Sequence, residues 1–229
     1  MGVVETIALA MGLAWASGIN LYATLAMLGI MGATGNMELP PDLVILQDPA
    51  VIAAASFMYC VEFFADKMPG VDTGWDTIHS FIRIPAAAVL AAGAVGDVNP
   101  ALVLAAAILG GALGATSHTL KTGTRVLINA SPEPFTNWGA SVTEDLAVFG
   151  GVWAAVYHPV PFLGFLVLFV VLAIWLLPKL WRGVVGLFAR LGRWLGRSQA
   201  PGRPAPGAFA QAAETAVPEL GGRDLLPKA

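Results

Sequence analysis

Apolar segments recur along this chain, and their length restricts the folds that it can adopt. Most of them reach the roughly 20 residues that a helix needs to cross a lipid bilayer. Six such segments cover about residues 3–31, 49–66, 73–96, 100–127, 139–157 and 160–181. The sequence therefore predicts an all-α fold, a polytopic membrane helical bundle of about six transmembrane helices within residues 1–181.

The composition supports this class. Of the 229 residues, 57% are hydrophobic and 12% are charged, whereas a soluble domain carries about 25% charged residues. The net charge of −3 lacks the basic surplus of nucleic-acid-binding proteins, so we expect no nucleic-acid partner. The single cysteine, Cys60, excludes an internal disulfide. Glu5 precedes the first apolar segment and no basic residue does, so we expect a retained span and not a signal peptide.

Lysine and arginine are unevenly distributed among the connections between the segments. The connections at 31–49, 97–99 and 157–160 carry neither residue. The basic residues lie instead beside the other connections and after the last segment. Because basic residues favour the cytoplasmic side, we predict that both termini are cytoplasmic, in a multi-pass protein of the inner (plasma) membrane.

One stretch, Glu62–Arg83, places many ionisable residues between two apolar segments. Such residues are costly at membrane depth and there usually pair or serve a function. Asp72, Asp76, His79 and Arg83 have offsets of 0, 4, 7 and 11, which form one stripe of a helix. The stretch also contains Asp66 and Lys67, followed by Pro69-Gly70. We predict a turn there and a new helix that begins near Asp72.

A second polar stretch carries the complementary charge. His118, Lys121 and Arg125 have offsets of 0, 3 and 7, again one helical stripe, and several hydroxyl residues surround them. Glu144 and Asp145 lie near the start of the fifth apolar segment. We predict that the basic stripe faces the acids of the first stretch or Glu144. The stripe either binds a phosphate or carboxylate group or belongs to a structural ion-pair network.

The two polar stretches are parts of a short internal repeat. MPGVDTGWDTI (Met68–Ile78) is similar to SPEPFTNWGAS (Ser131–Ser141). The second and third segments would then match the fourth and fifth, as two hairpins with their turns at the cytoplasmic side. Such repeats are common in transporters, with the site at their interface, although two turn segments can also be similar by chance.

The first apolar segment contains polar residues near its middle. Ser17, Asn20 and Thr24 share one face of a continuous helix. They either hydrogen-bond a neighbouring helix, or Gly18 and Asn20 mark an unwound stretch that exposes its backbone to a solute. Asn20 and Tyr22 are therefore candidates for the lining of a solute path.

The segment after the last span is basic. Its arginines lie near one helical face and are Arg182, Arg190, Arg193 and Arg197. We predict that residues 182–197 form an amphipathic helix on the lipid bilayer, bound to anionic lipids; a plain positive-inside stop signal is the alternative. Residues 198–229 are rich in Ala, Pro and Gly, which predicts a disordered tail.

Metal and enzyme motifs receive little support. Asp72, Asp76 and His79 have a spacing that could hold a divalent metal, but Arg83 on the same stripe would repel it, so we expect no metal. The sequence has no G-x-S-x-G, H-E-x-x-H or P-loop motif. We expect no cofactor.

Several of these segments resemble a known family. They are SGINLYATL (17–25), EFFADKMPGVDTGWDTIHSFIR (62–83), SHTLKTGTRVLINASPEPFTNW (117–138) and SVTEDLAV (141–148). They resemble the bacterial membrane-protein family catalogued as domain of unknown function 4126, over roughly residues 5–180. The resemblance implies a membrane bundle characterised by these polar segments and supplies no catalytic residues. The family is Pro-rich after Gly-Ile-Asn, whereas this chain has Leu21, so a proline-broken first helix is not implied.

Three functional hypotheses follow. The favoured one is a permease-like or flippase-like transporter for a small ion, an anionic metabolite or a lipid phosphate, with His79 as the first candidate for a proton-linked step. The second is a non-transporting scaffold that binds a partner through residues 182–229. The third is an intramembrane lipid-modifying enzyme that uses His79 or His118 with a carboxylate. The candidate site residues are Asn20, Tyr22, Glu62, Asp66, Lys67, Asp72, Asp76, His79, Arg83, His118, Lys121, Arg125, Glu144 and Asp145.

Overall fold

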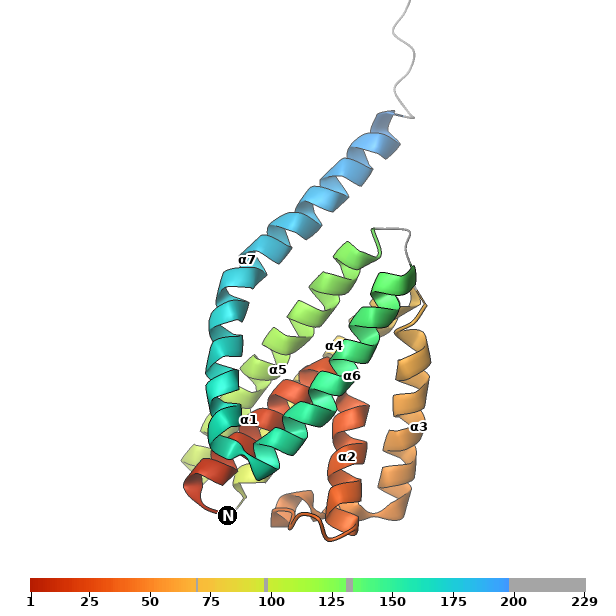
Figure 1. Ribbon diagram of the computed structural model, residues 1–229. Coiled ribbons are helices and arrows are strands. Elements are labelled where there is room, and N and C mark those ends of the chain that lie inside the picture. The colour runs from red at the N-terminus through yellow and green to blue at the C-terminus, as the bar shows by residue number, and fades with distance from the viewer. Residues whose placement is uncertain (69, 97–98, 131–133, 198–229) are drawn as a thin grey trace, which may run out of the picture. The chain divides into compact units, whose positions relative to one another are not determined.

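The computed structural model describes residues 1–68, 70–96, 99–130 and 134–197, and these residues form helices and their connections without a strand (Figure 1). The elements are α1 (Val3–Ile19), α2 (Leu21–Ala33), the short 3₁₀ helix η1 (Pro41–Gln47), α3 (Pro49–Ala65), α4 (Val71–Val95), α5 (Pro100–Ile128), α6 (Pro134–Tyr157) and α7 (Pro159–Arg197). Residues up to Leu187 form one compact unit, and the rest of α7 belongs to a second. The predicted tail, 198–229, lies outside the described residues. The all-α prediction is confirmed for the described part of the chain.

Within the described residues, three helices are long and apolar enough to cross a membrane. They are α4, α5 and the part of α7 from Pro159 to Arg190. Helices η1 and α3 meet the same criterion only together, and they are bent by 71° at the break between them. The structure thus supports three membrane-crossing helices, or four with the bent pair, and the larger number of six stays a prediction.

Local signals explain where the helices begin. Pro49 and Pro100 are the first residues of α3 and α5, the position where proline is best tolerated. The preceding residue caps the helix in both cases. Asp48 accepts a hydrogen bond from Ala50 N–H and Asn99 from Ala101 N–H, each at 2.8 Å, as expected for N-cap residues.

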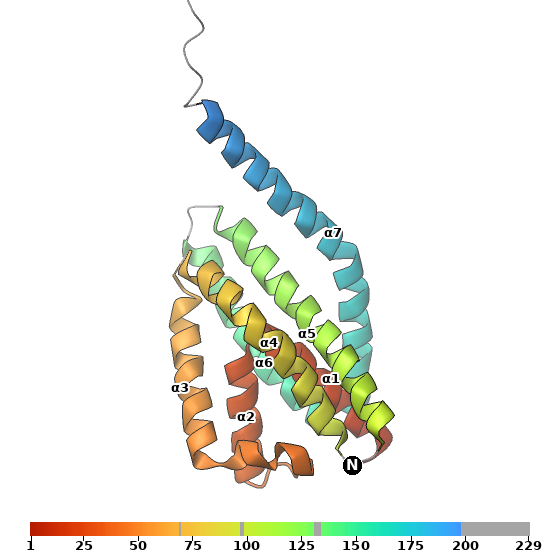
Figure 2. The same cartoon turned by 180° about the vertical axis from the view of Figure 1, so that it is seen from behind.

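Helix α1 is the central element of the bundle. It is buried almost continuously from Ala8 to Ile19 and packs on α4, α5 and α6; Figure 2 shows α4 and α5 passing across it. An apolar surface on all sides is typical of a helix enclosed by others. Glycines allow the close approach, because a Cβ at Gly18 would overlap Ser117 Oγ and the Gly114 carbonyl of α5.

The expectation that residues 3–31 form one span is wrong. Helix α1 ends at Ile19, Asn20 is extended with φ −145° and ψ 99°, and α2 begins at Leu21. The Asn20 side chain accepts a hydrogen bond from Ala23 N–H at 2.9 Å and so caps α2. Asparagine favours such caps over a helix interior, and the chain therefore breaks here without a proline. Of the two residues expected to mark an unwound stretch, Asn20 does so and Gly18 is helical.

This break changes the path of the chain. From Asn20, α2 runs back toward the end of the bundle where α1 starts (Figure 1). We call α1 and α2 the re-entrant hairpin, because the chain enters the bundle and returns to the same end. Met1 and Glu38–Pro41 line one small pocket together with the end of α4, and Tyr157 donates a hydrogen bond to the Asn36 carbonyl. The N-terminus thus lies with the connections that carry no Lys or Arg. The prediction of a cytoplasmic N-terminus is therefore not confirmed by this arrangement.

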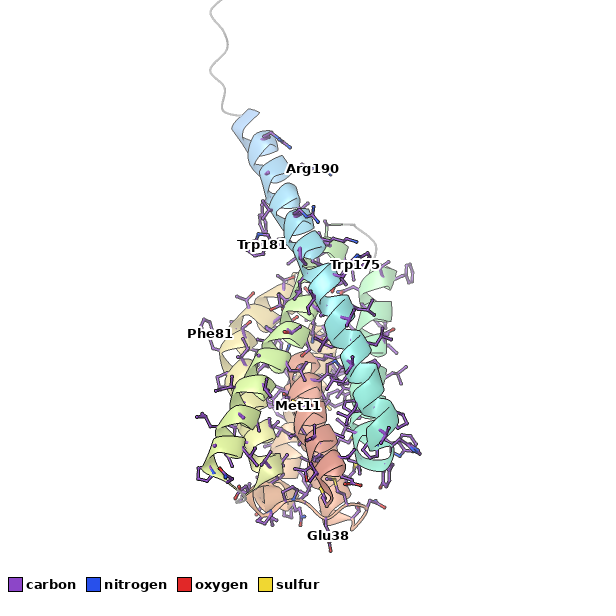
Figure 3. All side chains as sticks on the ribbon, turned by 90° about the vertical axis from the view of Figure 1, so that its left-hand side faces the viewer. Met11, Glu38, Phe81, Trp175, Trp181 and Arg190 are labelled. Carbon is purple, nitrogen blue, oxygen red and sulfur yellow. The ribbon has the colours of Figure 1, made fainter. Side chains whose placement is uncertain are left out.

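The opposite end of the unit holds the two hairpin turns. The end of α3 and the start of α4 lie at the same end of the unit as the end of α5 and the start of α6 (Figure 1), as the internal repeat predicts. Figure 3 shows Glu38 at one end of the unit and Trp181 toward the other. Helix α4 begins at Val71, as expected, after Gly70 with φ +87°. Residues 182–197 continue α7 and do not start a separate helix; their place on a lipid surface stays a prediction.

We predict that Gly18→Ala destabilises the bundle by about 1–3 kcal/mol, because the added methyl group would be forced against the backbone of α5. The measurement is the thermal unfolding midpoint in detergent. Gly150→Ala in α6 is the matched control, since a Cβ there meets no atom within 4 Å. Equal midpoints for the two variants would contradict the close contact between α1 and α5.

Candidate functional site

The structure brings the two charged stripes together. Asp72, Asp76, His79 and Arg83 on α4 are all buried, and so are His118, Lys121 and Arg125 on α5. Helices α4 and α5 pack side by side (Figure 2). Each stripe is thus the inward face of its helix, and neither is exposed to lipid or water.

Lys121 lies at the centre of the charged groups. Its Nζ is 2.9 Å from Asp66 Oδ2, 3.3 Å from Glu62 Oε1 and 3.5 Å from Asp76 Oδ1. Glu144 Oε2 follows at 3.8 Å. One ammonium group therefore connects carboxylates from α3, α4, α6 and the turn after α3. We refer to these five residues with Arg83 and Arg125 as the buried cluster.

Each hairpin also contains an ion pair of its own. In the first, Arg83 Nη2 donates to Glu62 Oε1 at 2.5 Å and Arg83 Nη1 donates to Asp76 Oδ1 at 2.8 Å. In the second, Arg125 Nη2 donates to Glu144 Oε2 at 2.7 Å and Nε donates to Oε1 at 3.3 Å. Arg125 also donates to the Asp66 carbonyl and to Asn137 Oδ1. In the first hairpin, the acid that pairs with the arginine across the two helices is Glu62 on the first helix, α3. In the second hairpin, it is Glu144 on the second helix, α6.

The re-entrant hairpin inserts its apex into this cluster. Lys121 Nζ donates to the carbonyl of Ile19, the last residue of α1, at 3.1 Å. A helix C-terminus carries partial negative charge, so it stabilises the ammonium group. Asn20 Nδ2 donates to Asp145 Oδ1 at 3.1 Å. The break at Asn20 thus places the Ile19 carbonyl beside Lys121 and the Asn20 amide beside Asp145.

The cluster has more acceptors than it uses. Four carboxylates and three bases take part in its ion pairs, which leaves one negative charge without a counterpart. Three carboxylate oxygens of the cluster are buried without a hydrogen-bond partner in the described structure: Glu62 Oε2, Asp66 Oδ1 and Asp76 Oδ2. Buried acceptors of this kind are normally satisfied, so the arrangement has room for at least one proton.

The comparisons with known proteins can now be considered. The family described as "Domain of unknown function (DUF4126)" matches residues 7–179. This chain belongs to that family. The matched range contains every residue of the buried cluster and both hairpins. No curated protein and no solved structure matches the chain.

Three predicted site residues of this family member lie apart from the cluster. His79 stacks on the Trp75 ring with 4.1 Å between centroids, its Nδ1 lies 2.9 Å from the Trp75 carbonyl, and Tyr22 packs against its other side. Asp72 accepts two hydrogen bonds from Asn129 at 2.8 and 2.9 Å. The histidine that contacts the cluster is His118, with Nδ1 3.4 Å from Arg83 Nη1.

Lys67, in the connection after α3, lies beside the cluster, and its ammonium group packs on the aromatic ring of Phe63. Its Nζ donates to the Phe63 carbonyl at 3.1 Å, lies 2.9 Å from the centroid of the Phe63 ring, and reaches Ser141 Oγ at 3.5 Å. Burial lowers the pKa of Lys67 below its ordinary value, and the nearby Asp145 opposes this shift. The ring face partly replaces water around the ammonium.

Sequence analysis missed three groups of the site. Asn137 stands inside the Thr-x-Trp of the repeat, so its position held a signal. Ser80 adjoins His79 and forms a 2.5 Å contact with His118 Nε2, but nothing in the helical stripe marks it. The Ile19 carbonyl is a backbone group with no side-chain signal. Among the described residues, no group of three or more His, Cys, Asp and Glu side chains is arranged to hold a metal.

We predict that Lys121→Met destabilises the protein by about 3–5 kcal/mol at neutral pH, because its carboxylates would then be buried without compensation. The loss should become smaller as the pH falls, since the carboxylates take up protons. Thermal unfolding in detergent across a pH series measures both effects. The control is Lys179→Met, whose Nζ packs on the Trp175 ring of α7. A pH-independent loss would contradict the proposed cause.

Proposed function

We propose that this protein is a permease-like membrane transporter that binds and moves a proton at the buried cluster. The observation that carries this proposal is the excess of carboxylates over bases in the cluster, with three carboxylate oxygens that have no hydrogen-bond partner in the described structure. An uncompensated charge costs several kcal/mol at such a position. A proton removes that cost directly.

The arrangement favours a proton over other small ions. Arg83, Lys121 and Arg125 are within the cluster and would repel a metal cation. A proton instead joins a carboxylate and leaves a neutral group. Anionic cargo, a metabolite or a lipid phosphate, receives less support, because each of these three bases is already bound to carboxylates.

The re-entrant hairpin adds a second argument. Discontinuous helices in transporters place half-helix ends and unwound backbone at the ion site, near the interface of repeated units. Here the C-terminal carbonyl of α1 faces Lys121, and Asn20 bonds Asp145. The two hairpins of the repeat, α3–α4 and α5–α6, both contribute ion pairs around this apex.

A scaffold is the second candidate. The charged stripes pair directly, and such pairing also describes a network that only holds helices together. A scaffold would show the same stability effects and no proton movement. Its partner-binding part would be residues 182–229, so deletion of that segment should abolish function and leave the bundle folded.

The hypothesis of a lipid-modifying enzyme is weakened by one contact. Ser80 Oγ and His118 Nε2 are 2.5 Å apart, the spacing of a nucleophile and its base. However, Arg83 contacts Nδ1 of the same ring, and a guanidinium can only donate. The ring proton must therefore be on Nε2, which then donates to the serine oxygen and cannot accept the serine proton.

We predict that Asp76→Asn lowers proton flux by roughly tenfold or more without loss of stability, because it balances the charges of the cluster. Purified protein in liposomes with an internal pH dye and a potassium diffusion potential measures the flux. Asp42→Asn, an exposed acid on η1, is the control. Absence of flux in the unmodified protein favours the scaffold, and unchanged flux in Asp76→Asn removes this carboxylate from the path.

We also predict an orientation. If the basic end faces the cytoplasm, the N-terminus is on the outer side of the inner membrane. In a Cys60→Ser background, a membrane-impermeant thiol reagent should label Gly2→Cys in intact cells and Arg182→Cys only after lysis. Labelling of both positions from the same side would contradict the re-entrant hairpin.

A further inference from the structure

A groove between α5 and α7 reaches the edge of the buried cluster. Its volume is about 550 Å³, and α7 contributes Leu177, Leu180 and Trp181 to its apolar wall. The other wall includes the polar side chains of Ser80, His118, Thr119 and Thr122, and the lining as a whole is mostly apolar. Thr122 Oγ1 is buried without a hydrogen-bond partner in the described structure. These polar groups are where water molecules would bind in the groove.

His118 separates this groove from the cluster. Its Nε2 lies 2.5 Å from Ser80 Oγ on the groove side, and its Nδ1 lies 3.4 Å from Arg83 Nη1 on the cluster side. Arg83 Nη1 also donates to Asp76 Oδ1 at 2.8 Å, so the imidazole and the carboxylate share one donor. The charged groups that face the ring are Arg83, Asp76 and Lys121.

The hydrogen-bond directions define the resting state of the ring. Arg83 donates to Nδ1, so the ring proton is on Nε2 and is donated to Ser80 Oγ. The Ser80 hydroxyl donates in turn to the Asp76 carbonyl at 2.9 Å. The Ser80 hydroxyl thus accepts from His118 and donates to the backbone of its own helix, while His118 and Ser80 both line the groove.

We propose that His118 is the proton relay between the buried cluster and the groove, and that the groove is the access path to water. This inference rests on the proposed function. Arg83 first turns from Nδ1 to Asp76 alone, which frees the one lone pair of Nδ1. The Asp76 carboxyl then gives its proton to Nδ1 while the Nε2 proton leaves to a water in the groove, and the new carboxylate holds Arg83 more strongly. Rotation of the ring resets the tautomer, and one proton has moved with no other change.

The first test uses two variants in the proteoliposome flux assay. His118→Gln keeps a hydrogen-bonding side chain but cannot relay a proton, and we expect roughly tenfold or greater loss of flux. His118→Ala should lose as much and regain flux when imidazole is added, because the ring can enter the emptied position. Unchanged flux in His118→Gln overturns the relay. Loss without imidazole rescue overturns it as well and leaves His118 a positioning residue for Arg83.

The second test detects access of water to the groove by the reactivity of an introduced cysteine. In a Cys60→Ser background, Thr122→Cys should react with a water-soluble thiol reagent in liposomes, and modification should block proton flux. Thr124→Cys, on the same helix but outside the groove lining, should keep its flux after the same treatment. An unreactive Thr122→Cys means that lipid fills the groove and overturns the access path.

The two proposals fail in different ways. If the unmodified protein moves no protons, the proposed function is wrong, whatever the His118 variants do. If it moves protons and the His118 and Thr122 variants behave like their controls, the proton site stands and this access path is wrong.

Discussion

The structure depends on one buried ammonium group. Lys121 Nζ is held by three carboxylates at 3.5 Å or less and by the carbonyl that ends α1. A lysine at membrane depth is unfavourable without such partners, and each acid would be unfavourable without the lysine. The helices that carry these groups therefore have to meet at one place. This requirement connects the two hairpins to each other and to the re-entrant segment.

The need for partners around Lys121 also involves the end of α1. A continuous first helix would carry its chain past the cluster with all carbonyls satisfied internally. The cap formed by Asn20 ends α1 early, so that the Ile19 carbonyl is available to Lys121 and the Asn20 amide to Asp145. The same break turns the chain back toward the end where α1 starts. Site and topology thus have a common origin in a single residue.

The same buried cluster can hold the helices together and also bind a proton. Every base of the cluster is bound, which gives rigidity, whereas three of its carboxylate oxygens keep an unused acceptor position. His118 is the one histidine among the described residues that bonds a base of the cluster, through Arg83. His79 packs against Trp75 and Tyr22 and does not line the groove.

Much of the buried cluster could be predicted from the sequence. A physical reason separates the features that could be predicted from those that could not. Helical periodicity is a local property, so the spacing of Asp76 and Arg83, and of Lys121 and Arg125, was enough to place each pair on one face. Their opposite charges and their cost in a membrane required the two faces to meet. The break at Asn20, the Ile19 carbonyl, the separation of His79 and the contact between Ser80 and His118 depend on how helices far apart in the chain pack, and only the tertiary structure decided them.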